Sequence, residues 1–169
     1  MSYIVLRGRW CNIFGLNAHA AREVKSDDSK DSVYEELEQV FENFPKYRMK
    51  ILLEGFKEKF ESEDIFKLRV GNESLHQDIN DNGVRIVNFA TSKNLIVEST
   101  MFPHRNIHKY TWTPPDGKTH NQIDHTLVDM RWNSSVLDVR SFRGADCDTD
   151  HYLMVAKVRE RLAVNKQAA

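Results

Sequence analysis

The feature that most constrains the fold is the order in which apolar, β-branched segments and amphipathic patterns follow one another. Two strand-like segments precede one helical pattern, another strand, a second helical pattern and then a run of strands. This order predicts an α/β (α+β) sandwich, because a doubly wound sheet would alternate strands and helices throughout. The expected strands cover residues 3–6, 10–16, 49–53, 95–100, 108–113, 122–128, 136–142 and 152–158.

Two helices are expected from apolar residues at helical spacing. Ser32 opens a capping-box sequence, which predicts a helix over residues 32–44. Asn80 or Asp81 is placed to cap a second helix that runs to about Lys93.

The length and composition fit a single domain. The 169 residues, 40% of them hydrophobic, can bury one core, so we expect one domain over 1–164 and a frayed tail over 165–169. The formal net charge is −1. Proteins that hold nucleic acid by bulk electrostatic attraction are usually basic, so any contact with DNA would have to be local.

The cysteines and the opening residues indicate a cellular compartment. Cys11 and Cys147 are far apart and lack metal-ligand spacing, so we expect reduced thiols in a nuclear or cytoplasmic protein that is not secreted. The apolar run over 3–6 is too short for a signal sequence or a membrane span, and no membrane contact is expected.

One motif suggests chemistry directly. Asp150 and His151 stand where an acidic loop meets the apolar segment 152–158, and Asp124 interrupts another expected strand. A rigid strand that fixes the direction of an imidazole near a carboxylate suits general acid–base catalysis. The Asp150-His151 motif alone also fits a loop with chance acidic residues and a surface histidine.

Five short segments carry a resemblance that extends from Gly8 to about Val164. The segments are 80–83 (NDNG), 111–113 (TWT), 122–125 (QIDH), 141–146 (SFRGAD) and 149–151 (TDH). Segments 111–113, 122–125 and 149–151 resemble the endonuclease/exonuclease/phosphatase family in their order and spacing. More specifically, the chain resembles the endonuclease domain of RTE-type non-LTR retrotransposons and domesticated copies of that domain, and this likeness includes segments 80–83 and 141–146.

The resemblance implies a fold and a reaction. The chain would be the C-terminal part of a four-layered α/β sandwich, with the N-terminal strands missing and the active site at one end of two packed sheets. Family members cut DNA by metal-assisted hydrolysis of a phosphodiester bond. Mg²⁺ or Mn²⁺ would therefore be the cofactor if the chain is active.

The same resemblance implies roles for five residues. His151 would contact the scissile phosphate or activate water, and Asp124 would hold its imidazole in the required tautomer. Asp150 would lie near the divalent metal. Asn17 would match the family's active-site asparagine, and Trp112 would match an aromatic residue on the DNA-facing rim, where it would bind substrate.

Other positions depart from the family pattern. Gly55 stands where the family has its catalytic Asp, and Lys57 stands where the family has the partner Asn. Glu54 could replace the lost carboxylate only through a local bulge, because neighbouring strand positions point to opposite faces. His19 occupies the position of the family's tyrosine, and a histidine can still donate to a phosphate.

The family's first half, which supplies a metal-binding Glu, has no counterpart in these 169 residues. Its absence is expected to expose a sheet edge and an apolar face. We therefore expect a protein partner that covers the open edge.

Three hypotheses follow. The leading one is a domesticated endonuclease-like domain with degraded catalysis that acts as a structural or protein-interaction module. The alternative is an active metal-dependent DNA endonuclease whose missing ligands come from a partner or from Glu54. A further alternative is DNA binding without catalysis, which would show a steep salt dependence.

Two further groups of polar residues need an interpretation. His120 and His125 flank Asp124 without metal-ligand spacing, so we interpret them as structural or exposed. Lys46, Arg48 and Lys50 fit either a solvated face or a remnant phosphate contact, and we favour the solvated face.

Overall fold

The computed structural model describes residues 1–19, 27–55, 68–76, 78–145 and 149–160, without the side chains of residues 19 and 27–29. The strands are β1 (Ser2–Arg7), β2 (Asn12–His19), β3 (Met49–Gly55), β4 (Leu95–Val97), β5 (His125–Asp129), β6 (Val136–Phe142) and β7 (Leu153–Val158). The helices are α1 (Asp27–Asn43) and α2 (Asp81–Ser92). Three 3-10 turns complete the elements: η1 (Glu98–Thr100), η2 (Asn106–His108) and η3 (Met130–Ser135).

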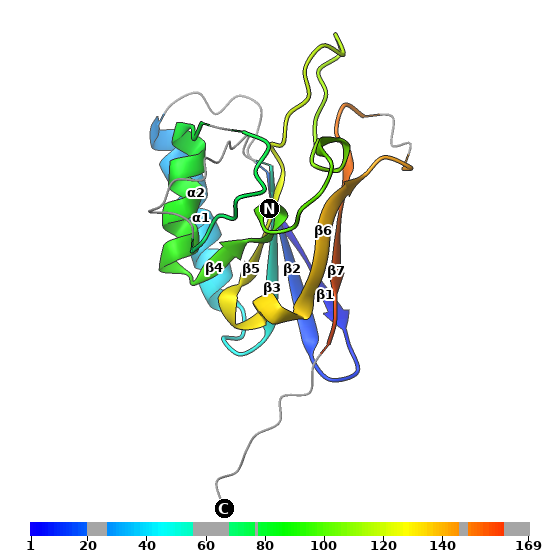
Figure 1. Ribbon diagram of the computed structural model, residues 1–169. Coiled ribbons are helices and arrows are strands. Elements are labelled where there is room, and N and C mark those ends of the chain that lie inside the picture. The colour runs from blue at the N-terminus through cyan, green and yellow to red at the C-terminus, as the bar shows by residue number, and fades with distance from the viewer. Residues whose placement is uncertain (20–26, 56–67, 77, 146–148, 161–169) are drawn as a thin grey trace, which may run out of the picture.

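The strands form two sheets. Five strands pair in the order β1-β2-β3-β5-β4, with β2 and β3 parallel and the other neighbours antiparallel. β6 and β7 form a separate antiparallel ribbon. Figure 1 shows α1 and α2 on one face of the five-stranded sheet and the ribbon on the other. The predicted α/β (α+β) sandwich is confirmed, and its mixed sheet excludes a doubly wound topology.

Each face of the large sheet has its own apolar core. Leu52 of β3 belongs to the core between sheet and helices, together with residues of α1 and α2. Met49 and Ile51 face the core between the two sheets, where Val139 of β6 also lies. Side chains thus alternate along β3 between two buried layers, as expected of a central strand.

The second helix begins as the sequence predicts. Asn80 is its N-cap, and the side chain of Asn80 accepts a hydrogen bond from the Gly83 backbone N–H at 2.9 Å. This contact satisfies one of the free N–H groups in the first turn. The helix ends at Ser92, one residue before the predicted end.

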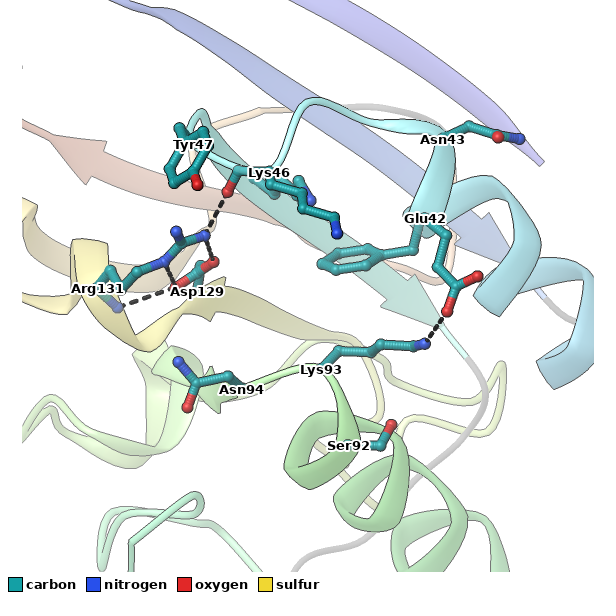
Figure 2. Close-up of a pocket in the computed structure, with 11 residues that line it drawn as sticks. Glu42, Asn43, Lys46, Tyr47, Ser92, Lys93, Asn94, Asp129 and Arg131 are labelled. Atoms are coloured by element: carbon teal, nitrogen blue, oxygen red, sulfur yellow. Dashed lines mark hydrogen bonds and ion pairs between the residues drawn. The ribbon is translucent and has the colours of Figure 1, made fainter.

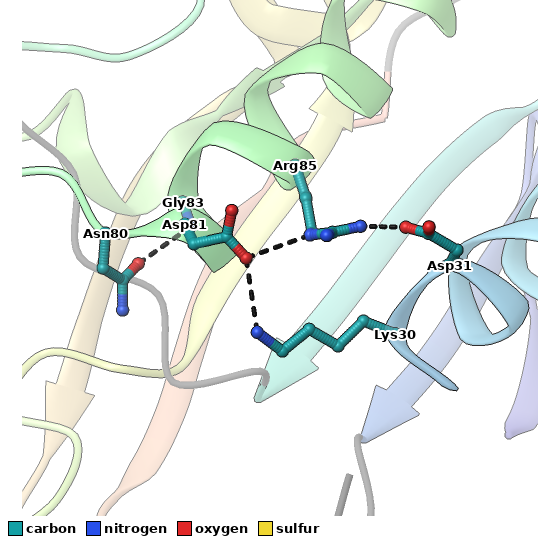
Figure 3. Close-up of polar contacts among 6 residues, drawn as sticks. All are labelled: Lys30, Asp31, Asn80, Asp81, Gly83 and Arg85. Carbon is teal, nitrogen blue, oxygen red and sulfur yellow. Dashed lines mark hydrogen bonds and ion pairs between the residues drawn. The ribbon is translucent and has the colours of Figure 1, made fainter. Parts of the chain in front are cut away.

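The first helix is longer than predicted, because α1 begins at Asp27. The prediction that a capping box at Ser32 starts this helix is therefore wrong. Polar residues upstream of Ser32 bind α2, which stabilises the additional turn. Lys30 bonds Asp81 at 3.3 Å, and Arg85 pairs with both Asp31 and Asp81 (Figure 3).

Several strand boundaries differ from the prediction. The prediction of a strand over 108–113 is wrong, because Trp112 forms only isolated bridges in this segment. The strand expected over 122–128 begins at His125, and the one over 95–100 ends at Val97. Side-chain hydrogen bonds replace strand pairing at these places; for example, Thr100 Oγ1 donates to the Val97 carbonyl at 2.7 Å. Strand β6 (136–142) agrees with the prediction at both ends.

β1 lies at the edge of the large sheet, and all six of its residues are exposed. Tyr3 is 66% exposed and Ile4 is 59% exposed. On the ribbon, the cross-strand neighbours Phe142 and Leu153 are also exposed. Apolar side chains therefore face solvent on two separate surfaces.

Other predictions concern the thiols, the membrane and the tail. Cys11 is free, and burial raises the pKa of its thiol, whereas Cys147 lies outside the described residues. No helix in the described ranges is both long and apolar enough to cross a bilayer. The tail predicted over 165–169 also lies outside the described part of the chain.

Candidate functional site

The structure brings Asp124 and His151 together. His151 Nδ1 lies 2.9 Å from Asp124 Oδ2. Asp124 immediately precedes β5, and His151 lies two residues before β7, so the contact joins the large sheet to the ribbon. A carboxylate bonded to one ring nitrogen fixes the tautomer and direction of an imidazole and supports positive charge on it.

A buried threonine holds the loop of Asp124 in place. The hydroxyl of Thr111 is fully buried and accepts hydrogen bonds from the backbone N–H groups of Ile123 and Asp124, at 2.8 and 3.0 Å. One residue further, the backbone of Trp112 forms bridges with Asn121 and His151. No local sequence pattern indicates the role of Thr111, because its partners lie more than ten residues away.

Trp112 and Asp150 form the second contact of the site. The indole Nε1–H of Trp112 donates to Asp150 Oδ2 at 2.7 Å, and the Thr113 N–H donates to the Asp150 carbonyl at 2.9 Å. The indole therefore orients the carboxylate that the family resemblance places near a metal. Trp112 is half-buried.

Asn17, His19 and Gly55 lie where β2 and β3 end. The parallel register pairs Asn17 with Leu53 and His19 with Gly55. The ends of β2 and β3 lie at the same end of the large sheet as the beginning of β5 (Figure 1). Asp124 immediately precedes β5. Within the described ranges, no hydrogen bond joins Asn17 to the Asp124–His151 pair.

The neighbouring carboxylate of Glu54 is directed away from this face. The β2–β3 register is continuous from Met49 to Gly55 and contains no bulge. Glu54 therefore shares the face of Leu52, which packs against the helices. Glu54 is only 3% exposed and pairs with His125 of β5. It does not take the place of a carboxylate at position 55.

The described residues do not fit a complete metal shell. Among them, no group of three or more His, Cys, Asp or Glu side chains is placed to hold a metal ion. The carboxylate of Asp124 binds His151, and one oxygen of Asp150 binds Trp112. Lys57 lies outside the described residues.

An aromatic and cationic cluster lies beside the site. The rings of Tyr110 and His120 stack with centroids 4.5 Å apart, and the Arg143 guanidinium lies over Tyr110 and Tyr152, at 5.6 and 5.0 Å. His120 Nδ1 also lies 2.7 Å from the Thr113 hydroxyl. His120 thus belongs to a defined cluster next to the site. No local pattern in the sequence indicates it, because the contacts join distant segments.

A second buried polar group lies in the neighbouring turn. His125 is 2% exposed, and its Nδ1 lies 2.9 Å from the Ser99 hydroxyl, in agreement with a structural role. Glu98, the adjacent residue in η1, is fully buried. Burial raises the pKa of the Glu98 carboxyl to about 7.

Sequence comparisons identify relatives of known name. No protein-family model matches the chain. It is 29% identical over 170 residues to craniofacial development protein 2 of Bos taurus, covering 97% of this chain and 27% of the relative. It is 34% identical over 137 residues to the same protein of Tragulus javanicus, covering 78% of this chain and 22% of the relative. The chain thus spans about a quarter of the length of these relatives.

Solved structures share the fold. The endonuclease domain of TRAS1, a telomere-specific non-LTR retrotransposon, superposes with a TM-score of 0.57 at 12% identity, covering 94% of this chain and 63% of that domain. The 3′-5′ exonuclease NExo from Neisseria meningitidis superposes with a TM-score of 0.60 at 18% identity, covering 92% and 64%. The chain therefore has a fold of the endonuclease/exonuclease/phosphatase type and is similar in sequence to a segment of craniofacial development protein 2.

Proposed function

We propose that this chain is a retrotransposon-derived DNA endonuclease-like domain in which phosphodiester hydrolysis is degraded, and that it acts as a structural or protein-interaction module. The fold neighbours support the ancestry, because one is a retrotransposon endonuclease domain and another is a 3′ phosphatase bound to a product DNA hairpin. RTE-type origin rests on the sequence resemblance.

The glycine at position 55 is the observation that best supports the proposed loss of catalysis. It stands at the family's catalytic Asp position, at the end of β3, and pairs with His19. Glycine has no side chain that could orient or deprotonate a water molecule. Glu54 is held on the opposite face by a continuous register, so it supplies no replacement. Loss of a positioned general base typically lowers a rate by about 10²- to 10⁴-fold.

The rest of the site explains why the fold persists without full catalysis. Asp124 still bonds His151, and Trp112 still bonds Asp150. Both contacts join the large sheet or its loops to the residues that precede β7. They therefore stabilise the packing of the ribbon whether or not a phosphodiester bond is cut.

Nicking of supercoiled plasmid in Mg²⁺ and in Mn²⁺ tests this proposal. The wild-type chain is expected to cut no faster than His151→Ala under either metal. Metal-dependent cleavage that disappears in His151→Ala would overturn the proposal. That result would instead support an active Mg²⁺- or Mn²⁺-dependent endonuclease.

The interaction role rests on β1. Its outer edge pairs with no strand in the described ranges, and its apolar side chains are exposed. An open edge of this kind accepts a strand from another protein, with main-chain hydrogen bonds providing affinity. We propose a protein partner that adds a strand to β1.

DNA binding without catalysis is a second candidate, favoured by the cluster of Tyr110, His120, Arg143 and Tyr152. Aromatic faces and an arginine next to the site could hold a base and a phosphate of single-stranded DNA. Fluorescence anisotropy with a labelled oligonucleotide tests this function. Binding that weakens with salt and is lost in Arg143→Ala would support this function. Equal binding by the wild type and Arg143→Ala would exclude the cluster as the DNA-binding site.

A further inference from the structure

A polar pocket lies at the end of the large sheet opposite the candidate site. The pocket has a volume of about 910 Å³ and lies between the C-terminal end of α1, the beginning of β3 and the end of β5. Lys50 enters it from the beginning of β3, five residues before Gly55 at the other end of the strand. Figure 2 shows the polar side chains that surround the opening. We call this the α1–β3 pocket.

Two of its four cations are already paired. Lys93 lies between Glu38 and Glu42, at 2.5 and 2.7 Å. Arg131 binds Asp129 and also donates to the carbonyl of Lys46 (Figure 2). These ion pairs balance the negative charges of Glu38, Glu42 and Asp129 near the pocket.

The other two cations, Lys46 and Lys50, have no carboxylate within ion-pair distance among the described residues. Lys50 is the more unusual of the two, because the residue is only 6% exposed. Its Nζ lies 4.6 Å from the centroid of the Phe41 ring, and it makes no hydrogen bond or ion pair within the described part of the chain. The prediction that Lys50 belongs to a solvated face is therefore wrong.

A buried ammonium group without an ion-pair partner is costly, because it loses hydration and the ring face of Phe41 replaces only part of that loss. Accordingly, burial lowers the pKa of Lys50. An anion in the pocket would offset this cost. Asp129 favours the charged form of Lys50 only from beyond ion-pair distance, because its carboxylate is bonded to Arg131.

We propose that the α1–β3 pocket binds a phosphomonoester dianion through Lys46 and Lys50. A phosphomonoester carries close to two negative charges at neutral pH and three acceptor oxygens, which matches two unpaired lysines. The volume lies in the range of small-molecule sites and leaves room for an organic group attached to the phosphate. Tyr47 and Asn94 line the pocket and offer a phenol and an amide group to that part of the ligand.

This site is independent of the nuclease ancestry. It contains none of Asn17, Asp124, Asp150 or His151, and no step of phosphodiester hydrolysis is needed for binding. The ligand class is a free phosphomonoester, such as a nucleoside monophosphate, that the chain binds without cleaving.

Titration of the ¹⁵N-labelled chain with adenosine monophosphate and with inorganic phosphate tests the proposal. Both probes are expected to cause saturable shifts of the backbone amides of Lys46, Tyr47 and Lys50. Lys50→Met keeps most of the unbranched side chain and removes its charge, so the variant is expected to fold. Its affinity for both probes should fall by about tenfold or more, as for loss of a charged hydrogen bond.

Lys157→Met is the matched control, because Lys157 is an exposed lysine of β7 that does not line the pocket. This variant should bind both probes like the wild type. Equal affinity in Lys50→Met and Lys157→Met would overturn the proposal. Shifts confined to Arg143 and His151 would also overturn it, since they would place the phosphate in the candidate nuclease site.

A thermal-shift measurement gives a second readout. Adenosine monophosphate should raise the melting temperature of the wild type and of Lys157→Met, because the ligand binds only the folded state. It should leave Lys46→Ala and Lys50→Met nearly unchanged. An equal rise in all four proteins would contradict a role for the two lysines.

Discussion

The buried carboxyl group of Glu98 is expected to make the stability of the fold depend on pH. The residue is fully buried in η1, and neither of its carboxyl oxygens accepts a hydrogen bond from the described residues. Burial alone raises the pKa of this carboxyl from 4.5 to about 7. The folded chain therefore holds the proton over a pH range in which the unfolded chain has released it.

The sign and size of the effect follow from this difference. Below pH 4.5 the carboxyl is protonated in both states, and the favourable contribution is fully present. As the pH rises from 4.5 to about 7, the unfolded state ionises first and stability is lost. One pKa unit corresponds to about 1.4 kcal/mol, so the total loss is about 3 kcal/mol.

Glu98→Gln removes this ionisation while keeping the shape of the side chain. We expect the free energy of unfolding, measured in urea from pH 4.5 to 8, to fall more steeply for the wild type than for Glu98→Gln. The difference between the two proteins should change by about 3 kcal/mol across the range. Glu36→Gln, at an exposed position of α1, is the surface control for the same substitution. A flat difference for Glu98→Gln would refute the reasoning.

Three further predictions concern individual contacts. Asn80→Ala should destabilise the chain by about 1 kcal/mol in urea unfolding, because the Gly83 N–H loses its cap; an unchanged midpoint would contradict the capping role. Gly71→Ala should cost roughly 2 kcal/mol by the same assay, since a Cβ there would lie 2.2 Å from the Thr100 carbonyl oxygen; full stability would show that the backbone adapts. Ile4→Thr should change stability by less than about 1 kcal/mol but reduce self-association in sedimentation velocity, because Ile4 is 59% exposed on the edge strand. Equal association of the variant and the wild type would argue against β1 as an interaction surface.

Local sequence patterns predicted the elements whose causes are local. Strand β6 alternates between buried and exposed residues, and its predicted ends agree with the structure. Asn80 caps α2 through a residue three positions away, which a sequence pattern can indicate. The fold family was also accessible from sequence, because its motifs are short and keep their order.

Contacts between distant segments could not be predicted in this way. α1 begins before Ser32 because Lys30 and Asp31 bind residues of α2 that lie about fifty positions away. The segment predicted as a strand over 108–113 is instead held by the bonds of Thr111 and Trp112. Lys50 looked like one of several surface cations, and only the packing of Phe41 against it shows that it is buried.

We propose that the missing carboxylate at position 55 is the cause of the degraded catalysis. Restoring the family's residues with Gly55→Asp and Lys57→Asn, in the otherwise unchanged chain, tests this claim most directly in the plasmid-nicking assay with Mg²⁺. We expect the double variant to cut about a hundredfold faster than the wild type, and we expect the addition of His151→Ala to abolish the gain. If the restored chain stays inactive while folded, the loss of catalysis has another cause. If the wild type already cuts at the rate of the double variant, catalysis was never degraded.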